Sequence, residues 1–451
     1  MACLAAFTTV FTMPVALTPR SIHDQESARI FYREHSPYDA LGNARGCSIG
    51  EFQSKQQLAL VVPSSGNVAK MKSSRSPLYQ SQKMKIHLDS RFYKRRELLQ
   101  KTCHKYYRYF NGSRFRKQAT GSKTNVQKRV SLCTTPKAAS MFWGRMLTAC
   151  DRISSVSLNK SRFVKSTVLP QGLYRSTIKY AFVRNPYTRL LSGYVDKIFS
   201  VNPYYWKGTG YHSLKLIRYR NRTLPANTTC GTDITFAEFV DYILHRNDRH
   251  ILNDNHFVPI HRQCAFCDSG YDYIGKMETF VEDMVYVAEA LGMMKHNSTR
   301  EVVVTEGLHG VDGMFYRNAR TLFGVRRKGM EECGVTMDQG LRVTWKRWQI
   351  RGMISMEIPF PAEAKRKDIT YTQFVELALN AHSRSDPNVL LKGKQMALRE
   401  AYGTLTYETK VTLRTFFEPE FEMFDYDSTP EFVFGEYEKA KFSFFDNKFA
   451  Q

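Results

Sequence analysis

The sequence predicts an α/β fold in which a P-loop-like parallel sheet is flanked by helices and interrupted by an irregular insertion. Two short β-favouring runs, KRVSLC (128–133) and TIKYAFVR (177–184), are each followed by a segment with helical periodicity. Strands that alternate with helices are typical of parallel sheets. The 451 residues are 42% hydrophobic and 13% aromatic, which is enough apolar surface for a sizeable core.

The helices that flank the predicted sheet begin at recognisable residues. The first strand leads through TTPKAAS (134–140) into a helix over 141–153. The second leads to Asn185, which suits a helix N-cap, and to Pro186, which is favoured at the first helical position. Periodicity predicts the remaining elements: an amphipathic helix over 88–110, a helix over 234–246, a strand over 269–276, a helix over 277–292, and a helix with an aromatic tail over 407–426.

Composition divides the chain into segments of different character. The first nineteen residues carry no charged side chain, as in a signal or anchor segment, and the following stretch is polar without periodicity, as in a stem. No later segment is apolar over the roughly eighteen residues that a membrane span needs. We expect an anchor-like segment at 1–20, a basic stem at 21–87, a folded domain at 88–430 with an irregular insertion at about 300–390, and a C-terminal tail at 431–451.

The charge balance points to polyanionic partners. The chain has 66 basic and 42 acidic residues and a formal net charge of +24. Such an excess is typical of proteins that meet nucleic acid, anionic lipid or an acidic polysaccharide. Between Lys70 and Arg129 eighteen Lys or Arg face two acidic residues, with aromatics among them. Because no helix-turn-helix, zinc-finger or RNP motif accompanies that stretch, nucleic acid is the less favoured partner.

The nine cysteines are an odd number and too sparse for a small disulfide scaffold. Two or three disulfides that reinforce an ordinary core would fit an oxidising compartment. Cys264 and Cys267 form a lone CxxC, without the second pair of ligands that structural zinc requires, so we expect disulfides there and no metal. Five N-x-S/T sequons are consistent with a luminal protein, at Asn111, Asn159, Asn221, Asn227 and Asn297.

Two turns between strand and helix carry residues suited to anion binding. Lys137 lies in a turn before a helix, whose first N–H groups attract anions. The turn contains no glycine and does not match the P-loop pattern, so taken alone it favours an ordinary surface lysine at position 137. Arg184 ends the second strand and Ser192 lies on the second turn of the next helix, where a guanidinium and a hydroxyl can converge on one phosphate. By spacing alone a solvated Arg184 is as well supported.

Five segments in one order resemble a known family. The segments are TTPKAASMFWGRML (134–147), FVRNPYTRLLSGYVDKI (182–198), NDNHFVPIHRQCAFCDSGYDYIGKMETFVED (253–283), KRRELLQKTC (94–103) and FEPEFEMFDY (417–426). The first two resemble the 5′-phosphosulfate and 3′-phosphate binding motifs of the Golgi carbohydrate sulfotransferases. The set is similar to the branch that holds the chondroitin and dermatan 4-O-sulfotransferases and the HNK-1 sulfotransferase.

The resemblance implies a site and a donor, 3′-phosphoadenosine 5′-phosphosulfate (PAPS), with no metal. Lys137 would bind the 5′-phosphosulfate and act in catalysis, and Arg184 and Ser192 would hold the 3′-phosphate. His256 would be the catalytic base, since imidazole titrates near the working pH; a structural histidine is the alternative reading. The rest of the donor loop would be Pro136, Ala138, Ala139, Ser140 and Met141, and Arg262 and His261 would contact the acceptor.

The implied function is sulfuryl transfer to a sugar hydroxyl of an acidic glycan, a glycosaminoglycan or a glycoprotein glycan, with a chondroitin- or dermatan-like acceptor expected. A Golgi luminal location follows, as a type II membrane protein or a secreted form. Three residues depart from the family pattern: Met141 replaces a threonine, Asn185 an aspartate and Phe257 a tryptophan. Because Met141 removes a phosphate-binding hydroxyl, a catalytically weakened relative that binds sulfated glycans stays an alternative, as does a small-molecule sulfotransferase. The segment at 300–390 is where acceptor specificity would differ.

Overall fold

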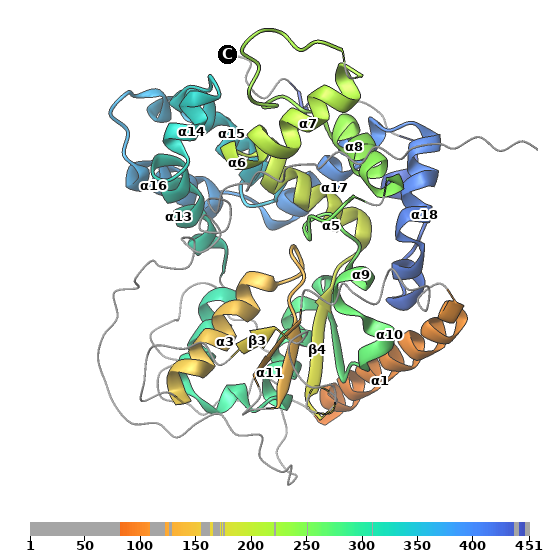
Figure 1. Cartoon of the computed structure of the whole chain (residues 1–451). Helices are drawn as coiled ribbons and strands as arrows, with labels where there is room; N and C mark the ends of the chain where they lie inside the picture. Colours follow the sequence, from red (N-terminus) through yellow and green to blue (C-terminus); the bar gives the residue numbers. More distant parts are fainter. Residues whose placement is uncertain are drawn as a thin grey trace, which may run out of the picture. The chain divides into compact units, whose positions relative to one another are not determined.

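The computed structural model in Figure 1 describes residues 82–108, 122–125, 129–154, 163–165, 172, 174, 176–220, 222–249, 251–308, 310–436 and 442–446. These residues all belong to one unit that spans 45–451. The predicted anchor at 1–20, most of the predicted stem and the sequons at Asn111, Asn159 and Asn221 lie outside them. Within the described ranges, no helix has the length and apolarity that crossing a membrane demands.

A five-stranded sheet carries the predicted strand-to-helix turns. Its strands are β1 (Ser122–Asn125), β2 (Val130–Cys133), β3 (Phe163–Lys165), β4 (Ile178–Val183) and β5 (Tyr273–Lys276), in the order β3-β1-β2-β4-β5. β4 pairs in parallel with β2 and with β5, which confirms the parallel sheet, while β1 runs antiparallel to β2 and β3. The carboxyl ends of β2 and β4 therefore lie at one edge, where ligands bind in open α/β sheets.

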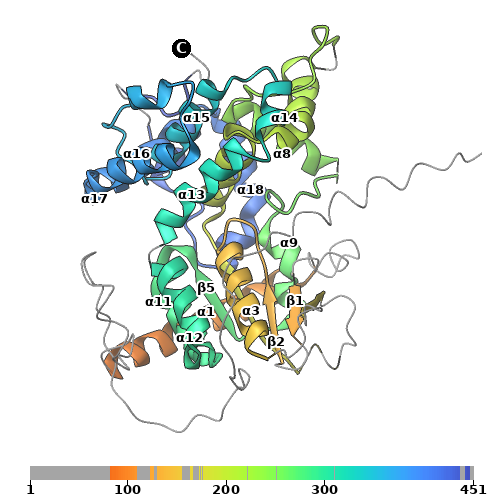
Figure 2. The ribbon, with the colours of Figure 1, turned by 90° about the vertical axis from the view of Figure 1, so that its left-hand side faces the viewer.

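Alternate residues of β4 face opposite sides of the sheet, as strand geometry requires. Tyr180 and Phe182 join a core cluster with α3 (Ser140–Ser154) and α11 (Phe280–Ala290). Ala181 and Val183 join a second cluster with α9 (Ile260–Cys264) and α10 (Phe266–Ser269). Figure 2 shows α3 and α11 beside the strands. Helices thus cover both faces, which explains why β4 is a nearly continuous hydrophobic run.

The predicted helices are present close to the predicted positions. They are α1 (Gln82–Lys105), α3, α5 (Pro186–Tyr194) with its π-helical continuation η5 (Val195–Phe199), α8 (Phe236–Asp248), the 3-10 turn η8 (Met277–Thr279) leading into α11, and α18 (Tyr407–Met423). Asn185 caps α5, with its side chain accepting from the Thr188 amide, and Pro186 follows at the first position. In α8, Thr235 and Glu238 form a capping box.

The segment predicted to be irregular at about 300–390 is helical, so that expectation was wrong. It contains α13 (Gly310–Phe323), α14 (Arg327–Glu332), α15 (Met337–Ile350), the 3-10 turn η11 (Ala362–Lys365), α16 (Tyr371–Ser383) and α17 (Pro387–Gly403). The helix α15 is buried on almost every side, including Thr344, Arg347 and Gln349. Buried polar residues of this kind interrupt the apolar stripe by which a helix is recognised in a sequence. The capping boxes of Thr336 and Thr370 were the available start signals.

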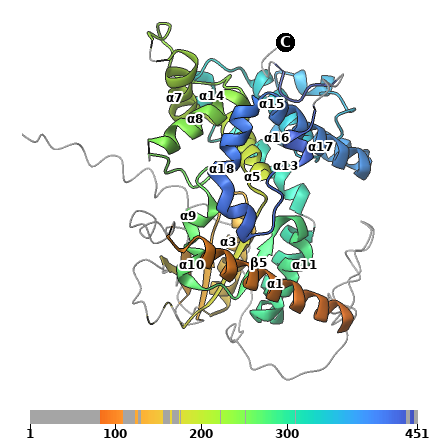
Figure 3. The same cartoon turned by 90° about the vertical axis from the view of Figure 1, so that its right-hand side faces the viewer.

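Helix α1 contacts α18, which is far from it in the sequence. One end of α18 meets α1 (Figure 3), and Lys105 Nζ forms an ion pair of 2.7 Å with Glu422. The predicted tail at 431–451 contributes to the main core through the buried side chains of Val433 and Phe444. Shorter elements connect these parts: α6 (Pro203–Tyr205), η6 (Trp206–Gly210), α7 (Tyr211–Ser213), η7 (Leu214–Arg218), η9 (Met293–Lys295), α12 (Asn297–Val302), η10 (Val303–Leu308) and α19 (Glu431–Phe434).

Candidate functional site

The turn that carries Lys137 is held in an unusual backbone conformation. It connects the end of β2 to the start of α3 at Ser140, and Thr135 Oγ1 fixes it to β4 through a 2.8 Å hydrogen bond to the Phe182 carbonyl. Lys137 and Ala139 have φ angles of 72° and 58°, which are strained for residues with a Cβ. Such strain persists where surrounding contacts enforce it and is frequent at binding sites. The amides of the first α3 turn are free of intrahelical partners by geometry.

The ammonium of Lys137 forms an ion pair with Asp196, a residue of the π-helical turn η5. Arg347 of α15 donates to the other oxygen of Asp196 at 2.6 Å. Burial lowers the pKa of Lys137 to about 7, with Asp196 opposing this shift and Arg351 adding to it. Although burial alone would raise the pKa of Asp196, the surrounding cations hold it well below its usual range. Lys137 is therefore a lysine that changes charge near neutral pH.

The predicted pair Arg184 and Ser192 line one cavity of about 200 Å³. Arg184 Nε donates to Thr188 Oγ1 at 3.0 Å, and its Nη1 lies 3.4 Å from the carbonyl oxygen of Lys137. Burial lowers the pKa of Arg184 to about 10, so the guanidinium remains charged at neutral pH. The structure thus places a guanidinium and a hydroxyl at a single cavity, next to the backbone of the Lys137 turn.

His256 lies at a second and larger cavity, of about 770 Å³. Its Nδ1 is 2.7 Å from Asp254 Oδ1, and the Tyr205 hydroxyl donates to Asp254 Oδ2 at 2.9 Å. We assign the Nδ1 proton to the bond with Asp254, which leaves Nε2 able to accept a proton. A histidine oriented by a carboxylate is the arrangement of a general base.

Electrostatic contacts connect His256 to the Lys137 turn. Burial lowers the pKa of His256, the hydrogen bond that it donates to Asp254 opposes the shift, and the positive charges of Lys197 and Lys137 add to it. Lys197 bridges the two groups, with its Nζ 3.6 Å from Asp196 Oδ2 and 5.0 Å from the centroid of the Tyr205 ring. The Lys137 turn and His256 are therefore parts of one candidate site.

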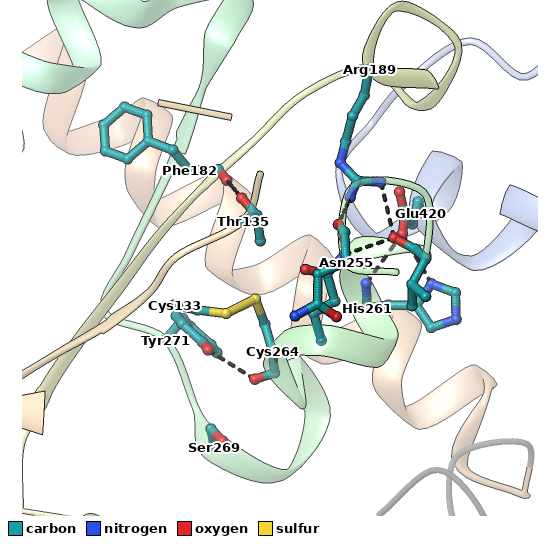
Figure 4. Close-up of a disulfide and its surroundings, with 12 residues drawn as sticks. Cys133, Thr135, Phe182, Arg189, Asn255, His261, Cys264, Ser269, Tyr271 and Glu420 are labelled. Atoms are coloured by element: carbon teal, nitrogen blue, oxygen red, sulfur yellow. Dashed lines mark hydrogen bonds and ion pairs between the residues drawn. A yellow bond between two sulfur atoms is a disulfide. The ribbon is translucent and has the colours of Figure 1, made fainter. Parts of the chain in front are cut away.

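Arg189 fixes the relative positions of the Lys137 turn and the His256 segment, a role that sequence reasoning missed. Its buried guanidinium donates to three carbonyl oxygens, those of Pro136 at 3.1 Å, Val258 at 3.0 Å and Asn255 at 2.7 Å. Pro136 belongs to the Lys137 turn, while the other two flank His256. Figure 4 shows Arg189 directed at Asn255, near the Cys133–Cys264 disulfide. This disulfide joins the end of β2 to α9, the helix that follows the His256 segment.

α5 and the His256 segment also meet through direct packing. A Cβ at Gly193 would lie 3.1 Å from the ring of Phe257, so the absence of a side chain permits the close approach. The Phe257 ring in turn packs on Phe239 of α8, with centroids 4.9 Å apart. The aromatic residue that departs from the family pattern is thus a buried support of His256.

Comparison with known proteins connects this geometry to a family. Residues 122–307, which include β1 to β5, Lys137 and His256, match the sequence model described as the sulfotransferase family. This region is similar to the sulfotransferase family. The motif-based resemblance to the carbohydrate sulfotransferases is confirmed at that level.

Several curated carbohydrate sulfotransferases are similar to this chain. Carbohydrate sulfotransferase 14 of Danio rerio is 29% identical over 182 residues, which are 38% of this chain and 48% of the relative. Carbohydrate sulfotransferase 9 of Homo sapiens is 30% identical over 221 residues, 45% of this chain and 48% of the relative. The chain thus spans about half the length of each of these two relatives. No solved structure matches the chain.

The remaining predicted residues of the matched region do not line either of the two cavities. His261 is buried, and its Nδ1 is 3.2 Å from Glu420 of α18. Arg262 donates to Asn247 Oδ1 at 2.8 Å. Neither lines the cavity of His256. Met141 is 64% exposed on the first turn of α3, beyond the partly buried Ser140.

The two CxxC cysteines of the matched region form two separate disulfides. Cys264 pairs with Cys133, and Cys267 pairs with Cys103 of α1. A third disulfide joins Cys230 to Cys333. The number of disulfides agrees with the sequence expectation of two or three. Across the described ranges, no cluster of His, Cys, Asp and Glu side chains suited to a metal ion is found.

Proposed function

We propose that the protein transfers a sulfuryl group from PAPS to a hydroxyl of a carbohydrate. The observation that carries the proposal is the connection of Lys137 to both cavities. Its carbonyl oxygen receives Arg184 at the smaller cavity, and its charge acts on His256 at the larger one. A site with an anion-binding side and a proton-accepting side suits transfer of a charged group between two substrates.

The chemistry of the smaller cavity fits the donor. Arg184 and Ser192 provide a guanidinium and a hydroxyl, both suited to a phosphate, and Leu191 and Val195 provide an apolar wall for a nucleoside. Lys137 and the first α3 amides are placed for a second anionic group. PAPS contributes an activated sulfuryl group joined to a 5′-phosphate. The donor is thus a substrate that this chain binds by charge at two separate points.

The residues of the chain have defined parts in the transfer. His256 Nε2 removes the proton from the acceptor hydroxyl while the acceptor oxygen forms a bond to sulfur. The bond between sulfur and the 5′-phosphate oxygen breaks, and 3′,5′-adenosine bisphosphate leaves with its electron pair. Protonated Lys137 offsets the charge that develops on the leaving phosphate. Asp254 stabilises the imidazolium, and Arg189 holds the two sides in register.

The larger cavity supports an acidic glycan as the acceptor, chondroitin- or dermatan-like. Its lining includes the cations Lys207 and Arg246 and the aromatic rings of Tyr204 and Tyr242. Aromatic faces pack against sugar rings, while cations attract the carboxylates of uronic acids. The net charge of +24 favours encounter with such a polymer.

The disulfides and sequons support a location in the Golgi lumen, as a type II membrane protein or a secreted form. Three disulfides are typical of proteins from oxidising compartments. The described sequon residues Asn227 and Asn297 are exposed and accessible to glycosylation.

The direct test is incubation of the full chain with sulfur-labelled PAPS and a panel of chondroitin, dermatan, other glycosaminoglycans and phenols. We expect label in a glycan, with the sulfated position identified by mass spectrometry. Lys137→Ala and Arg184→Ala should each lose binding of 3′,5′-adenosine bisphosphate in calorimetry. Lys215→Ala, at an exposed position outside both cavities, is the matched control and should bind normally.

Two results would contradict the proposal. Absence of transfer to every glycan, together with absence of nucleotide binding, would remove the donor and the reaction. Transfer to phenols alone would retain the donor but replace the acceptor class. Nucleotide binding without any transfer would favour the weakened relative that only binds glycans.

A further inference from the structure

Part of the donor cavity is built by helices outside the region that matches the sulfotransferase family. The cavity is lined by Arg184, Thr188, Leu191, Ser192, Val195, Met314, Ile350, Arg351, Met353, Lys394 and Leu398. The first five lie in the matched region, and the other six belong to the helical segment after residue 307. That segment was expected to adjust acceptor specificity, yet its side chains are at the phosphate-binding side.

Three cations meet at this cavity, and its lining contains no acidic residue. They are Arg184, Arg351 and Lys394. The positive charge of Arg351 acts on both Arg184 and Lys394. Like charges that share a cavity repel one another, most strongly at the half-buried Arg184 and Arg351, while water screens the exposed Lys394. Such a cluster is unfavourable in the free protein, and a bound anion relieves it.

The nearest carboxylates have other partners. Glu278 accepts hydrogen bonds from the Asn185 amide at 2.9 Å and the Tyr426 hydroxyl at 2.9 Å, and its negative charge offsets part of the repulsion at Arg184 and Lys394. Asp196 is held by Lys137 and Arg347. Neither acid lines the cavity. The cations are therefore available to a ligand that brings its own negative charge.

The backbone brings Arg351 and Lys394 together from two helices. Arg351 ends α15, and Gly352 follows with a φ of 64°, a conformation that favours glycine. A Cβ at Gly352 would lie 2.8 Å from the carbonyl oxygen of Leu390 and 3.5 Å from Lys394 Cβ. The end of α15 thus packs tightly on the first turns of α17, and this contact fixes the two cations at the same cavity.

We propose that Arg351 and Lys394 bind the 3′-phosphate of the donor together with Arg184, so that this helical segment determines selectivity for a 3′-phosphorylated nucleotide. The inference rests on the proposed function. A nucleotide phosphate is favoured over a sulfate group of the glycan because Leu191, Met314 and Leu398 give the cavity an apolar wall suited to a nucleoside. A cavity of about 200 Å³ suits the phosphorylated end of the nucleotide better than the whole donor.

Comparison of two ligands isolates the 3′-phosphate. Affinities of the full chain for 3′,5′-adenosine bisphosphate and for adenosine 5′-monophosphate are measured by calorimetry at fixed salt. In Arg351→Ala and Lys394→Ala, we expect the bisphosphate affinity to fall about 10- to 100-fold, the range for a lost hydrogen bond to a charged group. The monophosphate affinity should change far less, and Arg351→Lys should recover part of the loss because it restores the charge.

Matched controls separate binding from folding. Lys392→Ala changes an exposed lysine on the same helix that does not line the cavity, and Arg366→Ala changes an exposed arginine paired with Asp368. Both should bind each nucleotide as the unaltered protein does. All variants should share one thermal unfolding midpoint.

The outcomes are distinguishable. Selective loss of the bisphosphate supports the inference. Equal losses for both nucleotides, or no loss, overturn it while leaving the proposed function intact. Loss of binding to a sulfated disaccharide with unchanged nucleotide binding also overturns it, since the cluster would then serve the acceptor. If the unaltered protein binds neither nucleotide, the proposed function fails together with the inference.

Discussion

Asp196 is expected to control the pH range in which Lys137 is charged. The carboxylate pairs with the Lys137 ammonium and is itself held by Arg347 at 2.6 Å. Substitution Asp196→Asn keeps the size of the side chain and removes the negative charge. Burial and the charge of Arg351 then act on Lys137 without opposition, so its pKa must fall below the value of about 7 in the unaltered protein.

The size of the fall in the Lys137 pKa follows from the geometry of the ion pair. A pair of unit charges at about 4 Å contributes about 4 kcal/mol when the effective dielectric constant is about 20, and one pKa unit is about 1.4 kcal/mol. The Lys137 side chain is 11% exposed, so water screens part of the attraction. We expect the pKa to fall by at least about one unit. At pH 7 the charged fraction of Lys137 would then drop from about a half to about a tenth.

Binding of 3′,5′-adenosine bisphosphate between pH 5 and pH 9 reports this fraction. Because the phosphates also titrate near pH 6, each affinity is divided by that of the matching Lys137→Arg protein, whose side chain stays charged. Only protonated Lys137 attracts the ligand, so the ratio declines as pH rises through the lysine pKa. The decline should centre near pH 7 in the unaltered protein and at least about one unit lower in Asp196→Asn.

A control variant and two possible results test the role of Asp196. Asp233→Asn breaks the 2.7 Å ion pair with Arg218, which lies outside both cavities, and should leave the decline near pH 7. If Asp196→Asn and the unaltered protein decline at the same pH, Asp196 does not hold the proton on Lys137. A ratio that is flat over the whole range would mean that Lys137 does not titrate there.

Four further predictions concern the reaction and the framework. His256→Gln should lower kcat about 10²- to 10⁴-fold without changing nucleotide affinity, as for loss of a general base. The acid limb of the pH profile of kcat/KM should lie below the ordinary imidazole range, since burial lowers the pKa of His256. Asp254→Asn should move this limb to still lower pH, because it removes the carboxylate that opposes the lowering of the His256 pKa. Arg189→Ala removes three hydrogen bonds and should lower the free energy of unfolding by about 3–5 kcal/mol in denaturant titration. Cys133→Ser opens the disulfide to Cys264 and should cost about 2–5 kcal/mol in the same measurement.

Each of these predictions has a matched comparison. His212→Gln alters an exposed histidine outside both cavities and should retain kcat. Arg366→Ala removes an exposed ion pair and should change stability by less than about 1 kcal/mol. Cys230→Ser opens the disulfide to Cys333, away from both cavities, and should lower stability while kcat is retained in the folded protein. An acid limb at higher pH in Asp254→Asn would contradict the assignment of the His256 proton.

The sheet and its first helices could be predicted because local chemistry and tertiary position agree there. Asn185 and Pro186 begin α5 where a cap and a first helical residue are expected, and β4 is apolar because helices cover both of its faces. In α15 local chemistry and tertiary position disagree. Arg347 and Gln349 are buried because they bond to Asp196 and to backbone carbonyls, so polar residues occupy positions that a periodic pattern assigns to the core. Without those distant partners in view, the segment looks irregular.

The same reasoning explains which site residues the sequence could indicate. Lys137, Arg184 and Ser192 lie within two short turns, where spacing alone brings a cation and a hydroxyl near a helix start. Arg189 and Asp196 act through carbonyls and cations that come from separate parts of the chain, so nothing near them in the sequence reveals their contacts. A residue that binds a ligand must present a functional group suited to that ligand, and such a group can be recognised in the sequence. A residue that positions other side chains needs only a hydrogen-bond or ion-pair partner within the fold, which the sequence does not reveal. We therefore expect that the residues still to be identified in this site are mostly of the second kind, and that Asp196→Asn is the most informative of the variants because it tests one directly.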